Sequence, residues 1–181
     1  APNGVADFAV LLMLMCLRHA KQAIAREGVN DYTIDGLQGR ELRCLTVGIV
    51  GTGHIGRTVA KNLTGFGCKI LAYDPYPSEE LEGIAQYVSL EEIFAESDIL
   101  SFHVPLNEES RHMVNRESLK KMKDGVVLIN TARGELMDTQ ALIEGVESGK
   151  IGALGLDVIE GEGGIYFQDH RCSILQNQAM A

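Results

Sequence analysis

The stretch CLTVGIVGTGHIGRTVAKNLTGFGCKILAYD, residues 44–74, contains the features that decide the fold. Residues 45–50 form a short apolar run rich in β-branched side chains, which is typical of a parallel strand buried on both faces. Apolar residues then recur at helical intervals from Ile55 to Phe66, and a second apolar run follows at residues 69–73. The stretch therefore predicts a strand–helix–strand unit of a parallel sheet.

Three glycines, Gly51, Gly53 and Gly56, lie between the first strand and the helix in the spacing G-x-G-x-x-G. In a dinucleotide-binding turn the first glycine permits the tight bend, and the second lets a pyrophosphate approach the backbone. The third lets the helix pack closely on the strand. We expect the backbone N–H groups of His54 and Ile55 to point at the phosphates, at the positive end of the helix dipole.

Asp74 ends the second strand, 23 residues after Gly51. A carboxylate at this place can accept hydrogen bonds from the ribose hydroxyls of NAD. It would repel the 2′-phosphate of NADP, and the following Pro-Tyr-Pro supplies no arginine to neutralise that phosphate. Strand, helix and acid together predict an NAD site. A methyltransferase, which also has glycines after its first strand and an acid after its second, is a weaker alternative, as is a glycine-rich turn without a ligand.

Composition limits the class of protein. The chain has 181 residues, of which 45% are hydrophobic and 23% charged, as in a soluble globular domain. The net charge of −9 argues against binding to nucleic acid or to an anionic membrane. The longest apolar run, residues 8–17, is too short to span a membrane. The four cysteines form no C-x-x-C pair and no metal-ligand spacing, so we expect no metal site and a cytoplasmic location.

Apolar runs and helix signals alternate along the rest of the chain. Residues 5–26 predict one helix that is apolar nearly all round near Leu11–Leu17, which suits a core helix or one buried against another domain or subunit. The remaining strands are predicted at residues 85–88, 99–104, 126–130 and 151–158, and the remaining helices at 89–98, 117–122 and 139–147. This pattern predicts the α/β class: a doubly wound, Rossmann-type parallel sheet with helices on both faces.

Right-handed crossovers bring the carboxyl ends of parallel strands to one edge of the sheet, so His103, Arg133 and Asp157 are expected there together. The planar guanidinium of Arg133 suits a carboxylate bound bidentately beside the nicotinamide, and an ion pair with Glu135 is the alternative. His103 could tune the cofactor electrostatically or be a structural histidine. Glu162, just past the last strand, could keep a histidine charged for proton donation, although position alone favours a solvated loop acid.

Five segments, in order, resemble the D-isomer-specific 2-hydroxyacid dehydrogenases. They are VADFAVLLML (5–14), VGIVGTGHIGRTVAKNLTGFG (47–67), DILSFHVPLNEESRHMVN (98–115), GVVLINTARGELMDTQALIEGVESGKI (125–151) and GLDVIEGE (155–162). The resemblance implies that Arg133 binds the carboxylate and carbonyl of a 2-oxo acid, and that Glu162 belongs to a catalytic Glu–His pair. It also implies pyrophosphate contacts from His54 and Ile55 and a ribose contact from Asp74. Further residues are implied to lie along the cofactor or to flank the nicotinamide: Val104, Pro105, Ser110, Thr131, Ala132 and Asp157.

The Glu-Gly-Glu segment and the GGIYFQDHRCSILQNQ that follows it look like the D-lactate dehydrogenase branch of this family. This resemblance implies reduction of a small-molecule 2-oxo acid with NADH, with pyruvate to D-lactate as the leading expectation, by a homodimer. Bulkier 2-oxo acids are an alternative substrate class. An NAD(H)-sensing binding module, similar to the dehydrogenase-like transcriptional corepressors, is the alternative from another functional class.

The sequence also departs from the family pattern. It lacks the substrate domain, and it lacks the Pro-His pair that carries the family's catalytic histidine. We therefore expect residues 1–28 to be an inter-domain or dimer helix and residues 29–162 to be the NAD-binding domain of a longer enzyme. Residues 163–181 are expected to form an active-site insertion and the start of a return segment. On this interpretation the chain alone binds NAD(H) without turnover.

Overall fold

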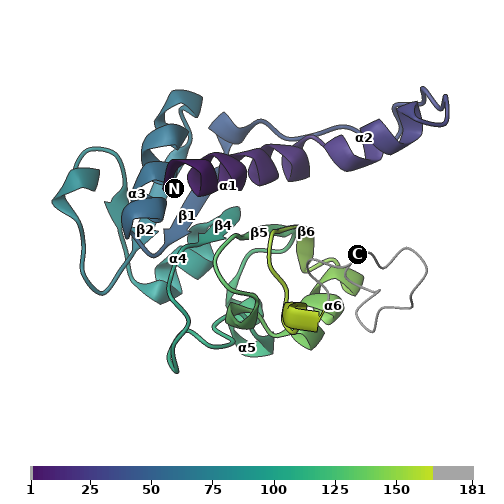
Figure 1. Cartoon of the computed structure of the whole chain (residues 1–181). Coiled ribbons are helices and arrows are strands. Elements are labelled where there is room, and N and C mark those ends of the chain that lie inside the picture. Colours follow the sequence, from purple (N-terminus) through teal and green to yellow (C-terminus); the bar gives the residue numbers. More distant parts are fainter. Residues whose placement is uncertain (1, 165–181) are drawn as a thin grey trace.

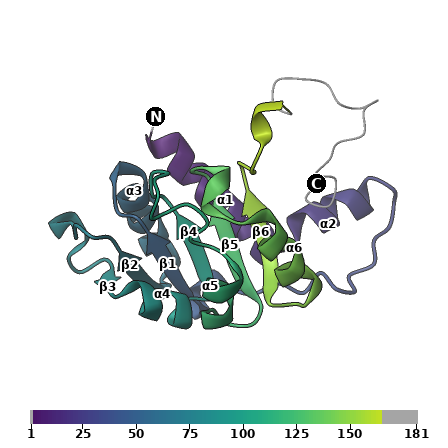
Figure 2. The same cartoon turned by 90° about the horizontal axis from the view of Figure 1, so that it is seen from below.

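A six-stranded parallel sheet lies at the centre of the computed structural model, which describes residues 2–164 (Figure 1). Its strands are β1 (Thr46–Val50), β2 (Lys69–Tyr73), β3 (Gln86–Tyr87), β4 (Ile99–Phe102), β5 (Val126–Asn130) and β6 (Ile151–Leu156). Their order across the sheet is β3-β2-β1-β4-β5-β6, which can be followed in Figure 2. This is the strand order of doubly wound dinucleotide-binding domains, so the predicted fold class is confirmed.

The strand order reverses at β1, which pairs with β2 on one side and with β4 on the other. Val47 is in register with Ile70 of β2 and with Ile99 of β4, and all five strand pairs are parallel. Connections therefore leave in opposite directions from the carboxyl ends of β1 and β4. A crevice opens at such a point in an α/β sheet, and ligands bind there.

Helices cover both faces of the sheet. One face carries α1 (Pro2–Leu17) and α3 (His54–Leu63), and the other carries α4 (Leu90–Glu96), α5 (Arg116–Lys121) and α6 (Thr139–Glu147) (Figure 1). Met13 of α1 and Ile49 of β1 belong to the core on the first face, and Phe94 and Phe102 belong to the core on the second. Because both faces are covered, nearly every residue of β1, β4 and β5 is buried.

The prediction of a single helix over residues 5–26 is wrong in its middle. The chain forms α1 and a separate α2 (Ala20–Glu27), which are bent by 69° relative to each other, and His19 between them has a φ of 50°. The Leu17 carbonyl accepts the N–H of Arg40 at 3.1 Å, and a Cβ at Gly39 would lie 2.3 Å from the same oxygen. The helix therefore breaks where the connector crosses it.

The two helices differ in their packing. α1 buries Ala6, Ala9, Met13 and Leu17 against the sheet and α3, so it is a core helix of this domain. α2 has no buried residue and extends away from the sheet (Figure 1). No single helix of the described part is long and apolar enough to cross a membrane; α1 and α2 meet that test only as a bent pair.

Most other elements follow the predicted pattern. β2, β5 and α6 have the predicted bounds, and α4 begins with a capping box of Ser89 and Glu92. Short 3₁₀ helices are η1 (Leu42–Cys44), η2 (Thr64–Phe66), η3 (Glu79–Leu81), η4 (Gly134–Leu136) and η5 (Glu162–Gly164). The insertion and return segment were expected at residues 163–181, and all of this range beyond residue 164 lies outside the described residues.

Candidate active site

The glycine-rich turn joins β1 to α3, and two of its glycines are required by close packing. Gly51 has a φ of 93°, and a Cβ on it would lie 2.8 Å from the His103 backbone. A Cβ on Gly56 would lie 1.9 Å from the Gly51 carbonyl oxygen. Around Gly53, by contrast, a Cβ would meet no atom within 4 Å. The turn is thus closely packed at Gly51 and Gly56 and open at Gly53, as a pyrophosphate site requires.

His54 and Ile55 are the first two residues of α3, where backbone N–H groups have no partner within the helix. The preceding N-cap residue is Gly53, which has no side chain with which to cap them. The His54 side chain is exposed, in agreement with a role for its backbone rather than its imidazole. The N–H groups at this helix start are therefore available to an anionic ligand.

A cleft of about 650 Å³ lies in front of the glycine turn, at the carboxyl ends of β1, β2 and β4. Seven of the residues predicted to bind the cofactor line it: Gly51, Gly53, Asp74, His103, Val104, Pro105 and Ser110. The structure thus brings together the predicted residues of the adenosine and pyrophosphate half of the site. The Ser110 hydroxyl is turned into its own loop, where it donates to the Pro105 carbonyl at 2.7 Å.

Asp74 is fixed against the glycine turn by residues that the sequence analysis did not identify. Its Oδ2 accepts the Thr52 N–H at 2.6 Å and the Thr52 hydroxyl at 3.1 Å, and its Oδ1 accepts the Tyr76 N–H at 2.8 Å. The Tyr87 hydroxyl donates to Thr52 Oγ1 at 2.9 Å. A carboxylate has about four acceptor positions, so Oδ1 keeps one for a ribose hydroxyl.

His103 lies at the end of β4, beneath the glycine turn, and lines the dinucleotide cleft. Its Nε2 lies 2.9 Å from the Ser101 hydroxyl, and burial lowers its pKa from 6.5 to about 4. The imidazole is therefore uncharged near neutral pH, which favours the structural alternative over electrostatic tuning by a cation. Ser101 and His103 lie two residues apart in the strand predicted at residues 99–104, where alternate residues share a face, so this pair could have been predicted from strand periodicity.

Arg133 follows β5 on a turn that a buried asparagine organises. Asn130 accepts the Ala132 N–H at 3.0 Å with its Oδ1 and donates to the Arg133 carbonyl at 2.8 Å. The exposed guanidinium contacts the Ala132 carbonyl at 2.6 Å, and within the described part of the chain no salt bridge joins it to Glu135. The ion-pair alternative is therefore not found, and the guanidinium can accept a carboxylate.

Two other predicted nicotinamide contacts lie beside Arg133. Asp157 follows β6, and its N–H donates to the Asn130 carbonyl at 3.0 Å, so the ends of β5 and β6 are tied together. The Thr131 hydroxyl is buried and has no hydrogen-bond partner among the described residues. Since a buried polar group normally has a partner, a bound polar group at this edge would satisfy it. The open turn and this hydroxyl both fit a dinucleotide whose nicotinamide reaches β5.

Glu162 closes a turn after β6, where its Oε2 accepts the Ile159 N–H at 3.0 Å. The glutamate that holds a histidine in the described part of the chain is its neighbour Glu160, whose Oε1 lies 2.5 Å from His112 Nε2. Partial burial acts to raise the pKa of Glu160, but hydrogen bonds from His112 and Thr139 outweigh it and lower the pKa. This pair could not be predicted from a local pattern, because His112 and Glu160 are 48 positions apart in the sequence.

Metal chemistry has no visible basis in the described residues, where no group of three or more His, Cys, Asp or Glu side chains is placed to hold an ion. The three cysteines of that part, Cys16, Cys44 and Cys68, are free thiols.

Comparisons with known proteins agree with this geometry. Residues 10–179 match the family model described as D-isomer specific 2-hydroxyacid dehydrogenase, NAD binding domain. A D-specific alpha-keto acid dehydrogenase of Enterococcus faecalis is 45% identical over 98% of this chain and 54% of its own length. The pyruvate reductase of Chlamydomonas reinhardtii has 47% identity and a TM-score of 0.92, over 99% of this chain and 53% of that one.

A third relative has been solved with ligands: the D-lactate dehydrogenase of Aquifex aeolicus, complexed with NAD and lactic acid. It is 42% identical, with a TM-score of 0.86, over 90% of this chain and 49% of that one. The chain thus spans about half the length of the relatives it matches. These matches exclude the methyltransferase alternative and confirm the predicted cofactor. The chain belongs to the D-isomer-specific 2-hydroxyacid dehydrogenases, in which it corresponds to the NAD-binding domain.

Proposed function

We propose that the protein carrying this chain reduces a 2-oxo acid to the D-2-hydroxy acid with NADH, and that pyruvate is its principal substrate. The observation that carries the proposal is Arg133, whose guanidinium is exposed at the sheet edge without an acidic partner in the described part of the chain. A planar cation in this position suits the carboxylate that all 2-oxo acids share. The relatives named pyruvate reductase and D-lactate dehydrogenase support pyruvate.

In this proposal the chain's own residues bind and orient the two reactants. The cleft at β1 and β4 holds the dinucleotide, and Asp74 selects NAD by accepting from the ribose and repelling a 2′-phosphate. When bound, NADH supplies the hydride that the reduction needs. Arg133 binds the substrate carboxylate and polarises the carbonyl, so that charge developing on the oxygen is stabilised.

Proton transfer is assigned to a pair that includes Glu162. Its Oε2 accepts the Ile159 N–H, which leaves Oε1 to hold a histidine and keep it protonated. We propose that this histidine lies outside the described residues, because the only histidine bonded to a glutamate within residues 2–164, His112, pairs with Glu160 instead.

Bulkier 2-oxo acids are the second candidate substrate class, which the name of the Enterococcus relative, an alpha-keto acid dehydrogenase, supports. The test is steady-state reduction by the protein at its full natural length, with NADH and either pyruvate or phenylpyruvate, followed by chiral analysis of the product. We expect D-lactate and a higher kcat/KM for pyruvate. A preference for phenylpyruvate would support the second class, and an L-product or no reduction would contradict the proposed function.

Other features of the whole protein stay predictions. Phe8 and Leu11 of α1 are exposed apolar side chains, 38% and 47% accessible, and they support the expected homodimer. The boundaries expected between an inter-domain helix, the NAD-binding domain and a return segment also stay predictions, as does the cytoplasmic location. The alternative of an NAD(H)-sensing module predicts NADH binding without any 2-oxo acid reduction, which the same assay would detect.

A further inference from the structure

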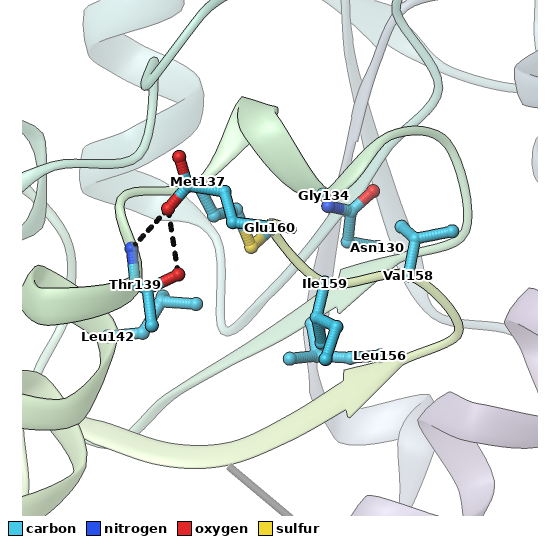
Figure 3. A pocket seen from close by; sticks show the side chains of 9 residues that line it. All are labelled: Asn130, Gly134, Met137, Thr139, Leu142, Leu156, Val158, Ile159 and Glu160. Carbon is cyan, nitrogen blue, oxygen red and sulfur yellow. Dashed lines mark hydrogen bonds between the residues drawn. The ribbon is translucent and has the colours of Figure 1, made fainter. Parts of the chain in front are cut away.

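Glu160 connects three loops on the sheet edge that carries Arg133 and Glu162. Its Oε1 lies 2.5 Å from Nε2 of His112, in the loop between β4 and α5. Its Oε2 accepts both the N–H and the hydroxyl of Thr139, at 3.1 and 2.7 Å, where α6 begins after the β5 loop (Figure 3). Glu160 itself lies in the segment after β6. We name Glu160, His112 and Thr139 the Glu160 clamp.

Arg133 is tied to the Glu160 clamp through its neighbour Gly134. A Cβ at Gly134 would lie 2.2 Å from the carbonyl carbon of Ile159 and 2.5 Å from the Glu160 nitrogen, so the two backbones are in direct contact. Figure 3 shows Gly134, Ile159 and Glu160 around one small cavity, with Thr139 on the Glu160 side. A shift of the Ile159–Glu160 peptide would therefore shift the turn that carries Arg133.

Glu162 is tied to the same peptide from the other direction. It lies two residues after Glu160, and its Oε2 accepts the Ile159 N–H at 3.0 Å. The His112 loop also pairs with the Arg133 turn, because the His112 N–H donates to the Glu135 carbonyl at 2.9 Å. The two proposed active residues thus share one mechanical support, the Ile159–Glu160 peptide.

The hydrogen bonds of the Glu160 clamp are charge-assisted, because their acceptor is a carboxylate. Glu160 accepts hydrogen bonds from three donors, and the Asp138 carboxylate lies 3.9 Å from the other ring nitrogen of His112. Hydrogen bonds to a charged group in a partly buried place are about twice as strong as neutral ones. Neither Glu160 nor His112 lines the cleft of the adenosine and pyrophosphate half, so the clamp lies outside that half of the cofactor site.

We propose that Glu160, held by His112 and Thr139, is a positioning residue that fixes Arg133 and Glu162 relative to each other for 2-oxo acid reduction. The inference rests on the proposed function. It assigns Glu160 no contact with substrate or cofactor; Glu160 acts through the two residues that have such contacts. Loosening the clamp therefore impairs use of the 2-oxo acid and leaves dinucleotide binding unchanged.

The test uses the protein at its full natural length and the variants Glu160→Gln, Thr139→Val and Thr139→Ser. We expect Glu160→Gln to lower kcat/KM for pyruvate about tenfold, the effect of losing one charge-assisted hydrogen bond, by raising KM and lowering kcat together. The Kd for NADH stays within about twofold. Thr139→Val lowers kcat/KM by about fivefold, and Thr139→Ser, which keeps the hydroxyl, restores it.

Glu144→Gln is the matched control. Glu144 lies on α6 and pairs with Arg116 of α5 through two 2.6 Å bonds, so its loss loosens neighbouring elements without touching the Glu160 clamp. We expect its kcat/KM to equal that of the wild type. An equal loss in Glu144→Gln, an unchanged kcat/KM in Glu160→Gln, or a loss confined to NADH affinity would overturn the inference. A wild-type protein that reduces no 2-oxo acid would overturn the proposed function, and the inference with it.

Discussion

The two halves of the site differ in which groups form them: mainly backbone in one half and charged side chains in the other. The cofactor half, Gly51–Gly56 with Asp74, is shaped by backbone: two glycines are packed against neighbouring peptides, and no side chain caps the first N–H groups of α3. The substrate half, Arg133 and Glu162, presents charged side chains on turns that side-chain hydrogen bonds hold in place. The first half forms when one strand–helix–strand unit folds, whereas the second needs three loops to meet.

This difference predicts a separation of effects. Changes in the cofactor half should alter folding or dinucleotide affinity, and changes in the substrate half should alter the reaction alone. The clamp of Glu160, His112 and Thr139 belongs with the substrate half, because it holds the peptide that contacts the Arg133 turn and Glu162.

The largest effect is expected from Arg133→Gln in the protein at its full natural length. Losing the charged, bidentate partner of the substrate carboxylate removes two hydrogen bonds of about 1.5–3 kcal/mol each, so kcat/KM for pyruvate should fall about a thousandfold. Steady-state kinetics measures this loss, and fluorescence titration measures NADH affinity, which should not change. Arg133→Lys keeps the charge but not the planar, bidentate guanidinium, so its kcat/KM should lie between that of the wild type and that of Arg133→Gln. A parallel loss of NADH affinity would contradict the claim that the two halves of the site act separately.

Two alanine substitutions in one turn should have opposite consequences. Gly56→Ala places a Cβ 1.9 Å from the Gly51 carbonyl oxygen, so the free energy of unfolding should fall by about 3 kcal/mol or more. Gly53→Ala meets no neighbour, so stability should change by less than about 0.5 kcal/mol while NADH affinity falls at least about tenfold, because the methyl group fills the phosphate space.

Urea denaturation and NADH titration of both variants separate these effects. The proposed difference between the two glycines is wrong if Gly53→Ala lowers the free energy of unfolding as much as Gly56→Ala does. It also fails if Gly53→Ala binds NADH like the wild type.

A smaller effect is expected from pH through His103. Burial lowers its pKa from 6.5 to about 4, so the unfolded chain binds a proton that the folded chain does not in this range. The stability that neutral His103 contributes is complete above pH 6.5 and is lost as the pH falls towards about 4, by up to about 1.4 kcal/mol per pH unit.

His103→Asn lacks this titration. The difference in unfolding free energy between wild type and variant should therefore shrink from about pH 7 to about pH 5, measured by urea denaturation. A difference that stays constant over that range would mean that His103 is not buried in its neutral form.

The cofactor half was accessible to sequence reasoning because its signals are local. Glycine spacing, strand composition and the acid after β2 all lie within residues 44–74, and each has one physical function. The meeting of the strands' carboxyl ends at one edge follows from the right-handed crossover rule. The position of Arg133 at the sheet edge followed from the same rule, although its lack of an ion pair with Glu135 did not.

What sequence reasoning missed depends on contacts between distant residues. Thr52 and Tyr87 meet across 35 positions, and His112 and Glu160 across 48, with no periodic pattern that links them. The break between α1 and α2 has the same origin, because Arg40 in a distant connector takes the Leu17 carbonyl. Local propensity continues that helix, and a tertiary hydrogen bond ends it.

The most direct test of the central claim, that this chain forms an NAD site with Asp74 as its selector, is titration of the chain with NADH and with NADPH. The account predicts a Kd for NADH at least about tenfold lower than that for NADPH, because the carboxylate accepts from a ribose hydroxyl and repels a 2′-phosphate. Asp74→Asn should narrow that difference. Equal or tighter binding of NADPH by the wild-type chain would contradict the account.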